Sequence, residues 1–163
     1  MPTRSAGLLP FRRTPDLEVL LAHPGGPFWA KKEAGAWSIV KGEHPEDEPP
    51  LTAAQREFHE ETGWIATGPF LELGEIRQRS GKRVTAWAVE FACDPATLVS
   101  NRFTIEWPPR SGRQQSFPEI DRVRWCDPDE ARRLIHPDQA ALIERLQVLL
   151  TASGSSTADA DRS

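Results

Sequence analysis

The stretch GEHPEDEPPLTAAQREFHEETGW, Gly42–Trp64, is the part of the chain that decides its fold. Its acidic, proline-rich beginning cannot be helical throughout, although proline is well placed at the first position of a helix. The residues that follow predict a helix over Leu51–Thr62. Gly63 ends this helix, because glycine readily takes the left-handed conformation that closes one.

Three glutamates on this helix are predicted to share one face. Residues three and four apart are neighbours on a helix, so Glu57, Glu60 and Glu61 project into a narrow arc. Crowded carboxylates cannot all stay ionised without a compensating cation, and Mg²⁺ or Mn²⁺ prefers oxygen ligands. Phe58 lies on another face and is expected to anchor the helix in the core. A solvated acidic face is the alternative for an isolated cluster of this kind.

Residues around the arc favour a metal site over a solvated face. Arg56 adjoins the glutamates and can orient one carboxylate through a bidentate ion pair. Gly42 allows a backbone carbonyl to approach a bound ion where a side chain would obstruct it. We therefore predict that Mg²⁺ or Mn²⁺ binds between the helix and the loop that precedes it.

The spacing of these residues resembles the Nudix box, G-x₅-E-x₇-R-E-U-x-E-E-x-G-U, in which U is a bulky apolar residue. The matching positions are Gly42, Glu48, Arg56, Glu57, Phe58, Glu60, Glu61, Gly63 and Trp64. On this resemblance the chain is identified as a member of the Nudix hydrolase family. The resemblance implies an α/β fold, the Nudix α/β/α sandwich with a mixed sheet flanked by helices, and metal-dependent cleavage of a phosphoanhydride bond.

The resemblance also implies roles for the matching residues. Glu57, Glu60 and Glu61 look like the metal ligands, and one of them is a candidate base that activates water. The backbone carbonyl of Gly42 is similar to the extra oxygen ligand used in this family. Arg56, together with the earlier glutamate of the box, looks like a support that holds loop and helix in position. Arg56, Glu57 and Glu61 form the predicted catalytic set on the helix.

A later carboxylate completes the predicted site. Members of this family commonly recruit one from a loop beyond the box, either for metal or as general base, and the stretch Phe117–Trp125 resembles that element. Glu119 is the candidate for both roles. An exposed loop carboxylate is the alternative.

Substrate recognition is predicted from cations and aromatic rings outside the box. Lys41 directly precedes the box and is expected to point its charge at the phosphates. Trp29 and Trp107 offer faces on which a nucleobase can stack. Arg110 and Arg113 suit polyphosphate recognition. Core packing of the tryptophans and solvation of the three cations are the alternatives.

The remaining sequence predicts strands and helices that surround the box. The predicted strands are residues 5–12, 17–22, 37–40, 70–79, 83–91, 103–107 and 123–126, and two further helices are predicted over 127–135 and 138–150. Loops are expected over 23–35 and 108–117. This order predicts a mixed sheet covered by helices on both faces. One domain is expected over residues 1–150, followed by a disordered polar tail over 151–163.

Composition narrows the classes of partner and the compartment. A net charge of −4 and a pI near 5.6 argue against binding of long nucleic acid, which needs a broad basic surface. The two cysteines, Cys93 and Cys126, are expected to be reduced and packed. No signal peptide or membrane span is recognised, so we expect a cytoplasmic protein without a membrane partner. The four histidines lack metal-ligand spacing, and surface or loop positions are expected for His23, His44, His59 and His136.

The predicted partner is a small nucleotide, with a dinucleoside polyphosphate or a nucleoside triphosphate favoured. The chain contains no tyrosine, and it has Gln78 and Arg79 where ADP-ribose members often carry a proline. The element around Glu119 resembles that of dinucleoside polyphosphate and RNA 5′-pyrophosphate hydrolases. A nucleotide-binding sensor without turnover and an RNA 5′-pyrophosphohydrolase are the alternatives. Homodimers are common among relatives, although nothing in the sequence marks an interface.

Overall fold

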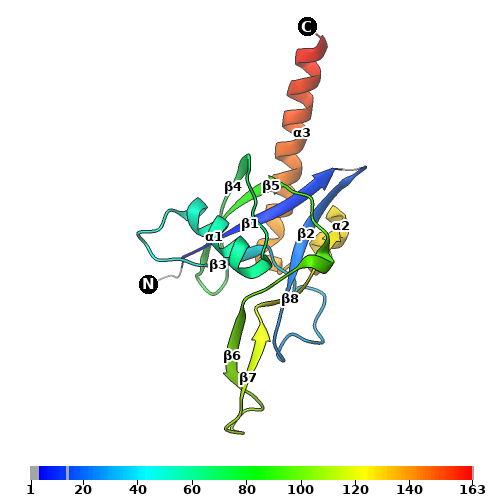
Figure 1. The fold of residues 1–163 in the computed structure, drawn as a ribbon. Coiled ribbons are helices and arrows are strands. Elements are labelled where there is room, and N and C mark those ends of the chain that lie inside the picture. The colour runs from blue at the N-terminus through cyan, green and yellow to red at the C-terminus, as the bar shows by residue number, and fades with distance from the viewer. Residues whose placement is uncertain (1–3, 14, 163) are drawn as a thin grey trace.

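The computed structural model describes residues 4–13 and 15–162, with side chains placed for the described residues up to Ala152. A six-stranded mixed sheet forms the centre of the molecule, with helices on both sides (Figure 1). The strand order is β4-β5-β1-β2-β8, and β3 pairs with β1. The strands are β1 Arg4–Arg13, β2 Leu17–Pro24, β3 Val40–Glu43, β4 Phe70–Arg77, β5 Arg83–Glu90 and β8 Ile120–Cys126. The β1–β5 pair is parallel and the other pairs are antiparallel.

Three α-helices cover this sheet. They are α1 Pro50–Thr62, α2 Pro128–Leu134 and α3 Ala140–Arg162, and short 3₁₀ turns occur at Pro95–Thr97 and Pro137–Gln139. Helix α1 has proline in its first turn and ends at Gly63, whose φ of 81° is left-handed. Both features were predicted, because proline lacks the amide hydrogen that a first turn does not need and glycine has no Cβ to oppose a positive φ.

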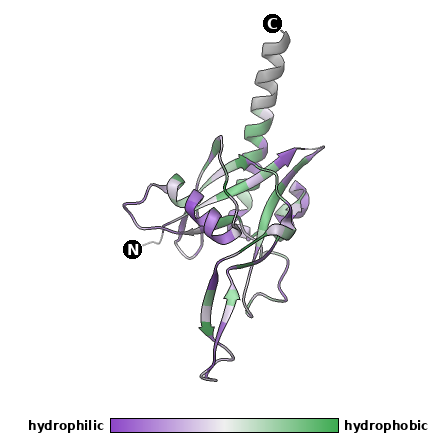
Figure 2. Ribbon diagram, viewed as in Figure 1, coloured by the Kyte–Doolittle hydropathy of each residue, from purple (hydrophilic) through white to green (hydrophobic). Residues whose placement is uncertain are grey.

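Side-chain alternation along β1 separates two apolar cores. Leu8 packs in the cluster that contains Phe58 of α1. Leu9 faces the other way and packs in the cluster that contains Leu134 of α2 and Leu142 of α3. Successive residues of a strand point to opposite faces, so β1 serves both cores. Figure 2 shows the central strands in largely hydrophobic colours and α1 in largely hydrophilic ones. The predicted mixed sheet with helices on both faces is therefore confirmed.

A separate two-stranded hairpin projects from the body of the molecule (Figure 1). It consists of β6 Arg102–Glu106 and β7 Gln114–Pro118, which pair antiparallel. The prediction placed β7 inside a loop over 108–117, and this was wrong. The residues of β7 are polar and mostly exposed, so no alternation of apolar and polar side chains marks the strand.

Two other boundaries differ from the prediction. A strand was expected over 37–40, but β3 begins only at Val40. Trp37 and Ser38 make only isolated bridges, to Ile135 and Ala22 respectively, so they lie outside the strand. The ribbon of α3 continues to Arg162, whereas a disordered tail was expected from Thr151. The apolar stripe that predicts this helix consists of Ala141, Leu142, Leu146 and Leu149, so it could not mark a helical extension beyond them. Ser163 lies outside the described residues, and disorder of the tail in solution stays a prediction.

No helix within the described ranges is long and apolar enough to cross a membrane.

Candidate active site

Helix α1 presents its carboxylates on the side opposite its anchor. Phe58 is completely buried between the helix and the sheet, so the helix cannot rotate without exposing it. Glu57, one residue earlier, is 9% exposed, Glu61 is half-buried and Glu60 is exposed. The helical spacing therefore brings the three predicted ligands to one face at graded depth, as expected.

Arg56 ties the loop before α1 to the glutamates on it. Its Nε and Nη2 donate to the two carboxylate oxygens of Glu48 at 2.9 and 2.8 Å. Its Nη1 donates to Glu57 at 2.9 Å and to Glu60 at 3.2 Å. The hydrogen bond from Arg56 holds the pKa of Glu48 below its usual value. Arg56 thus has the contacts expected of a support for loop and helix.

Gly42 lies directly against the Glu57 carboxylate. A Cβ built at Gly42 would lie 2.2 Å from Glu57 Cδ and 2.2 Å from Oε2, which is far inside contact distance. The clash involves a carboxylate that Arg56 also holds. Only glycine therefore lets β3 approach α1 this closely, and the Gly42 backbone is positioned beside a predicted metal ligand.

The carboxylates of the site are short of positive charge. Burial, together with the neighbouring Glu57 and Glu119, raises the pKa of Glu61 to about 8. Burial also raises the pKa of Glu57, against the opposing effect of Arg56. The pKa of Lys41 is lowered to about 8, mainly by burial and then by Lys82. A cation placed among these groups would stabilise their ionised forms.

The donor chemistry fits a hard divalent cation, although the side chains do not converge as a finished coordination group. Within the described ranges, no three histidine, cysteine, aspartate or glutamate side chains meet in an arrangement that could hold a metal ion. Arg56 engages Glu57 and Glu60, which accounts for their orientation. Oxygen donors, burial and mutual repulsion nevertheless match what Mg²⁺ or Mn²⁺ requires. Gly42 places no side chain between its own backbone and the Glu57 carboxylate.

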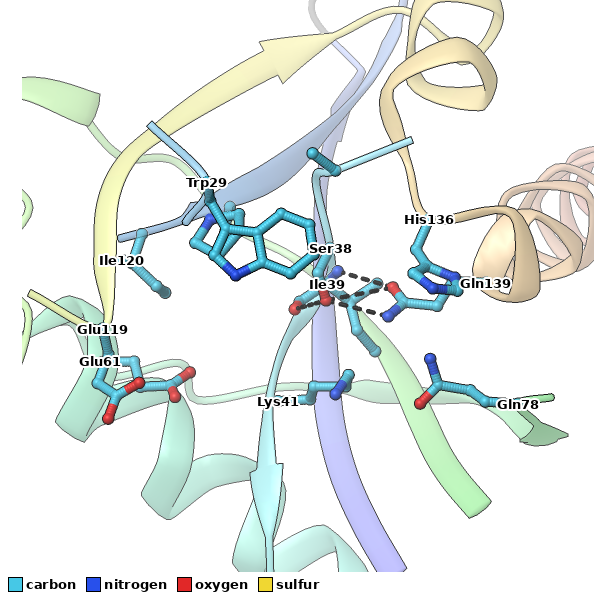
Figure 3. A pocket seen from close by; sticks show the side chains of 13 residues that line it. Trp29, Ser38, Ile39, Lys41, Glu61, Gln78, Glu119, Ile120, His136 and Gln139 are labelled. Carbon is cyan, nitrogen blue, oxygen red and sulfur yellow. Dashed lines mark hydrogen bonds between the residues drawn. The ribbon is translucent and has the colours of Figure 1, made fainter. Parts of the chain in front are cut away.

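A cavity of about 260 Å³ begins at this site. Glu61, Glu119 and Lys41 form one end of it, while Glu57 and Glu60 lie outside its lining. Figure 3 shows the two carboxylates on one side of the Trp29 indole. The structure therefore brings together four predicted site residues that are far apart in sequence.

The other predicted substrate residues do not line this cavity. Trp107, Arg110 and Arg113 belong to the β6–β7 hairpin and the turn at its end. The Trp107 ring packs edge-on against Phe28, with centroids 5.2 Å apart. Phe28 is 61% exposed, so these two rings form an aromatic surface next to the loop that carries Trp29.

The far end of the cavity was missed by the sequence analysis. Gln78, His136 and Gln139 line it on the side of Trp29 away from the glutamates (Figure 3). Neutral amides carry no spacing signal, and His136 was expected only in a surface or loop position. Only the tertiary structure brings the end of β4, which Gln78 follows, next to the turn before α3, which carries His136 and Gln139.

His23 contradicts the expectation that it lies on the surface or in a loop. It is in β2 and completely buried. Its Nδ1 lies 2.8 Å from Asp121 Oδ1, and its Nε2 lies 2.7 Å from the carbonyl oxygen of Lys32. Its ring also packs against Trp37. Two polar partners make burial of the imidazole tolerable and fasten the Trp29 loop to β8.

Both cysteines are free. Cys126 is buried, and burial raises the pKa of its thiol to about 12. Cys93 is partly buried, and burial raises the pKa of its thiol to about 11. A packing role, as predicted, is consistent with thiols that resist ionisation.

Comparison with known proteins identifies the family. A family model described as the NUDIX domain matches residues 1–146. No curated protein matches the chain in sequence. Among solved structures, a C. elegans Ap4A hydrolase binary complex is similar, with a TM-score of 0.65 and 18% identity over 91% of this chain and 98% of that one.

Two further solved structures show the same fold. The NUDIX domain of Shewanella oneidensis NrtR complexed with ADP ribose has a TM-score of 0.62 and 17% identity, covering 92% of this chain and 89% of that one. A Nudix hydrolase from M. smegmatis, RenU, has a TM-score of 0.57 and 25% identity, covering 92% and 86%.

The chain therefore belongs to the Nudix family, which confirms the resemblance drawn from Gly42–Trp64. By class it is a hydrolase that acts on phosphoanhydrides.

Proposed function

We propose that the protein is a metal-dependent pyrophosphohydrolase that cleaves a dinucleoside polyphosphate or a nucleoside triphosphate. The observation that carries this proposal is the half-buried Glu61, whose pKa is raised to about 8 and which lines a cavity together with Lys41. A carboxylate with a raised pKa in a cavity is typical of functional sites. Membership of the Nudix family supports the same chemistry.

A divalent ion, Mg²⁺ or Mn²⁺, would supply positive charge to the phosphate oxygens and lower the pKa of water. Its proposed ligands are Glu57, Glu60, Glu61, Glu119 and the backbone carbonyl of Gly42. Arg56 is proposed to hold Glu57 and Glu60 at the correct depth, because it already binds both of them and Glu48.

The chain's own groups then perform two tasks. Lys41 places an ammonium group against the phosphates, where its charge opposes the repulsion that keeps water from attacking. A carboxylate accepts the proton of the attacking water as the oxygen approaches phosphorus in line with the leaving group. Glu119 is our candidate for this base, because it lines the cavity and its carboxylate makes no side-chain hydrogen bond within the described part of the chain.

The two aromatic surfaces suggest where the rest of the substrate lies. Trp29 lines the cavity and can stack on one base. Phe28 and Trp107 lie beyond it, next to Arg110 and Arg113 on the hairpin turn. A dinucleoside polyphosphate has a second base and additional phosphates, which these residues are placed to contact.

The test is release of phosphate or pyrophosphate from nucleoside triphosphates, dinucleoside polyphosphates, ADP-ribose and 5′-triphosphorylated RNA. We expect turnover that requires Mg²⁺ or Mn²⁺ and stops with EDTA, and a higher melting temperature when the ion binds the folded state. Turnover of 5′-triphosphorylated RNA alone would favour the RNA alternative, which the net charge of −4 disfavours. Turnover that EDTA leaves unchanged would contradict the metal assignment.

A nucleotide sensor is the second candidate, and one observation favours it. Arg56 pairs with both Glu57 and Glu60, so these two carboxylates have a cationic partner within the chain itself. The NrtR domain crystallised with ADP ribose is a fold neighbour. Tight nucleotide binding without hydrolysis of any substrate would establish this reading. A cytoplasmic location and a homodimer stay predictions.

A further inference from the structure

The wall of the cavity farthest from the carboxylates carries neutral polar side chains that the proposed chemistry does not use. Gln139, His136 and Gln78 lie there, across Trp29 from Glu61 (Figure 3). We propose that this wall is a nucleobase subsite, in which Trp29 stacks on the base while N–H donors of Gln139 and His136 select bases that carry a ring carbonyl. The inference rests on the proposed nucleotide hydrolysis and names the class of base.

The amide of Gln139 is fixed in one orientation. It is 1% exposed, and its Oε1 accepts from the backbone amide of Ile39 at 3.1 Å, so this atom must be the oxygen. Its Nε2 donates to Ser38 Oγ at 3.1 Å, and that hydroxyl donates to the Ile39 carbonyl at 2.7 Å. One hydrogen of Nε2 is left without a partner among the described residues. Oε1 also faces Ser38 Oγ at 3.3 Å, so both of its acceptor positions face protein groups, whereas one N–H of Gln139 has no protein partner within the described ranges.

The imidazole of His136 is oriented in a similar way. Its Nδ1 accepts from the backbone amide of Asp138 at 3.1 Å. A neutral imidazole has one donor and one acceptor, so the hydrogen must lie on Nε2. His136 therefore adds a second N–H donor at the same wall. Gln78 makes no side-chain hydrogen bond within the described ranges, so its amide can turn to either partner and does not discriminate.

The cavity is of a size that suits a base, with the rest of a nucleotide outside it. Its volume of about 260 Å³ lies just below the range of roughly 300–1,000 Å³ that is typical of small-molecule sites. Only Glu61 and Glu119 of the proposed metal ligands line it. The phosphates therefore lie at the open end, near α1, and the base occupies the end that Gln139 and His136 line.

The donors at this wall discriminate between bases. Guanine presents two neighbouring acceptors, N7 and the carbonyl O6, whereas adenine presents the acceptor N7 beside an amino donor, so one of two N–H groups at this wall would face that donor. Uracil and thymine present a carbonyl oxygen where cytosine has its amino group. A donor facing a donor leaves both groups unpaired in a buried place, which costs far more than an imperfect hydrogen bond. The subsite should therefore accept keto bases and reject adenine.

The first experiment compares ITP with ATP, because hypoxanthine replaces the amino group of adenine with a carbonyl. We expect kcat/KM for ITP to exceed that for ATP by about tenfold or more, which is the expected effect of one unpaired buried donor. GTP should resemble ITP. Equal kcat/KM for ITP and ATP would overturn the subsite while leaving the proposed hydrolysis intact.

The second experiment measures binding without catalysis. IMP and AMP contain no phosphoanhydride bond, so their binding in EDTA can be followed by quenching of tryptophan fluorescence, with Trp29→Phe to identify the signal. We expect IMP to bind more tightly than AMP by a similar factor. This preference without hydrolysis of any nucleoside triphosphate or dinucleoside polyphosphate would support the subsite and overturn the proposed function. Equal binding of the two would overturn the subsite.

Two variants assign the selectivity to named donors. His136→Phe keeps a ring but removes the donor, and it should reduce the ITP preference several-fold through KM, with kcat little changed. Gln139→Glu replaces the donor by an acceptor and should favour ATP. If burial of the new charge prevents Gln139→Glu from folding, His136→Phe decides alone. His44→Phe, at a half-buried loop position outside the cavity lining, is the control and should change neither ratio. Unchanged selectivity in a folded His136→Phe variant would overturn the assignment of that donor.

Discussion

Helix α1 and the β6–β7 hairpin both present charged side chains to solvent, yet the fold supports them very differently. Helix α1 packs on β1 and β3, and Phe58 fixes its rotation. The strands of the hairpin pair mainly with each other, and the arm projects from the body (Figure 1). Charge alone therefore does not make a precise site. The glutamates of α1 are held to a fixed depth, whereas Arg110 and Arg113 keep the freedom of exposed side chains.

The largest expected effect follows from neutralising the carboxylate of α1 that lines the cavity. Glu61→Gln keeps the size of the side chain but removes a charge from the proposed metal and phosphate site. We expect kcat to fall on the order of a hundredfold or more, because contacts of this kind act in the transition state. The fold should persist, and circular dichroism with thermal unfolding checks it. Near wild-type turnover by a folded variant would remove Glu61 from the site.

Gly42→Ala tests the close approach of β3 to α1. The added Cβ would overlap the Glu57 carboxylate, so that side chain must leave its contact with Arg56. We expect a loss of kcat/KM of some tens-fold, since misplacing a reacting group by about 1 Å can cost a hundredfold. Gly81→Ala is the control for a glycine replaced away from the site: a Cβ there meets nothing within 4 Å, and its positive φ adds a backbone strain that Gly42 does not carry. Equal losses in both variants would mean that the Glu57 contact is unimportant.

Glu119→Gln is expected to lower kcat by about tenfold or more, in the lower part of the range for loss of a general base. Glu119 lies on the segment between β7 and β8, not on α1. The loss of kcat in this variant therefore measures how precisely the fold positions the end of the hairpin. The measurement is kcat across a pH series with saturating Mg²⁺. An unchanged rate at every pH would exclude Glu119 as the base.

The smallest effect is expected on the hairpin itself. Replacing Arg110 and Arg113 together by alanine should raise KM for a dinucleoside polyphosphate about threefold, because exposed ion pairs contribute below about 1 kcal/mol each. The KM for a nucleoside triphosphate and both kcat values should stay unchanged. The difference should shrink as salt is added. A large fall in kcat would show that the hairpin closes onto the reacting phosphates.

The same contrast explains how much could be predicted from the sequence. The helix over Leu51–Thr62, its end at Gly63 and the apolar position of Phe58 follow from periodicity and local backbone chemistry. The convergence of Lys41 and Glu119 with Glu61 could be expected only through the family resemblance.

What could not be predicted depends on contacts between distant residues. Strand β7 is polar, so only its pairing with β6 defines it. His23 is buried because Asp121 and the Lys32 carbonyl satisfy its nitrogens, and neither partner is near it in sequence. Gln139 lies at the cavity because the turn before α3 meets Ser38 and Ile39. No local pattern contains that information.

The position of β1 has a consequence for how the protein is made. This strand pairs with β2, β3 and β5 and contributes to both apolar cores, yet it leaves the ribosome before each of those partners. Until β5 is synthesised, one edge of β1 has no partner strand. Unpaired edges of apolar strands promote aggregation of nascent chains. Slow elongation between β2 and β5 should therefore lower the soluble yield more than slow elongation after β5.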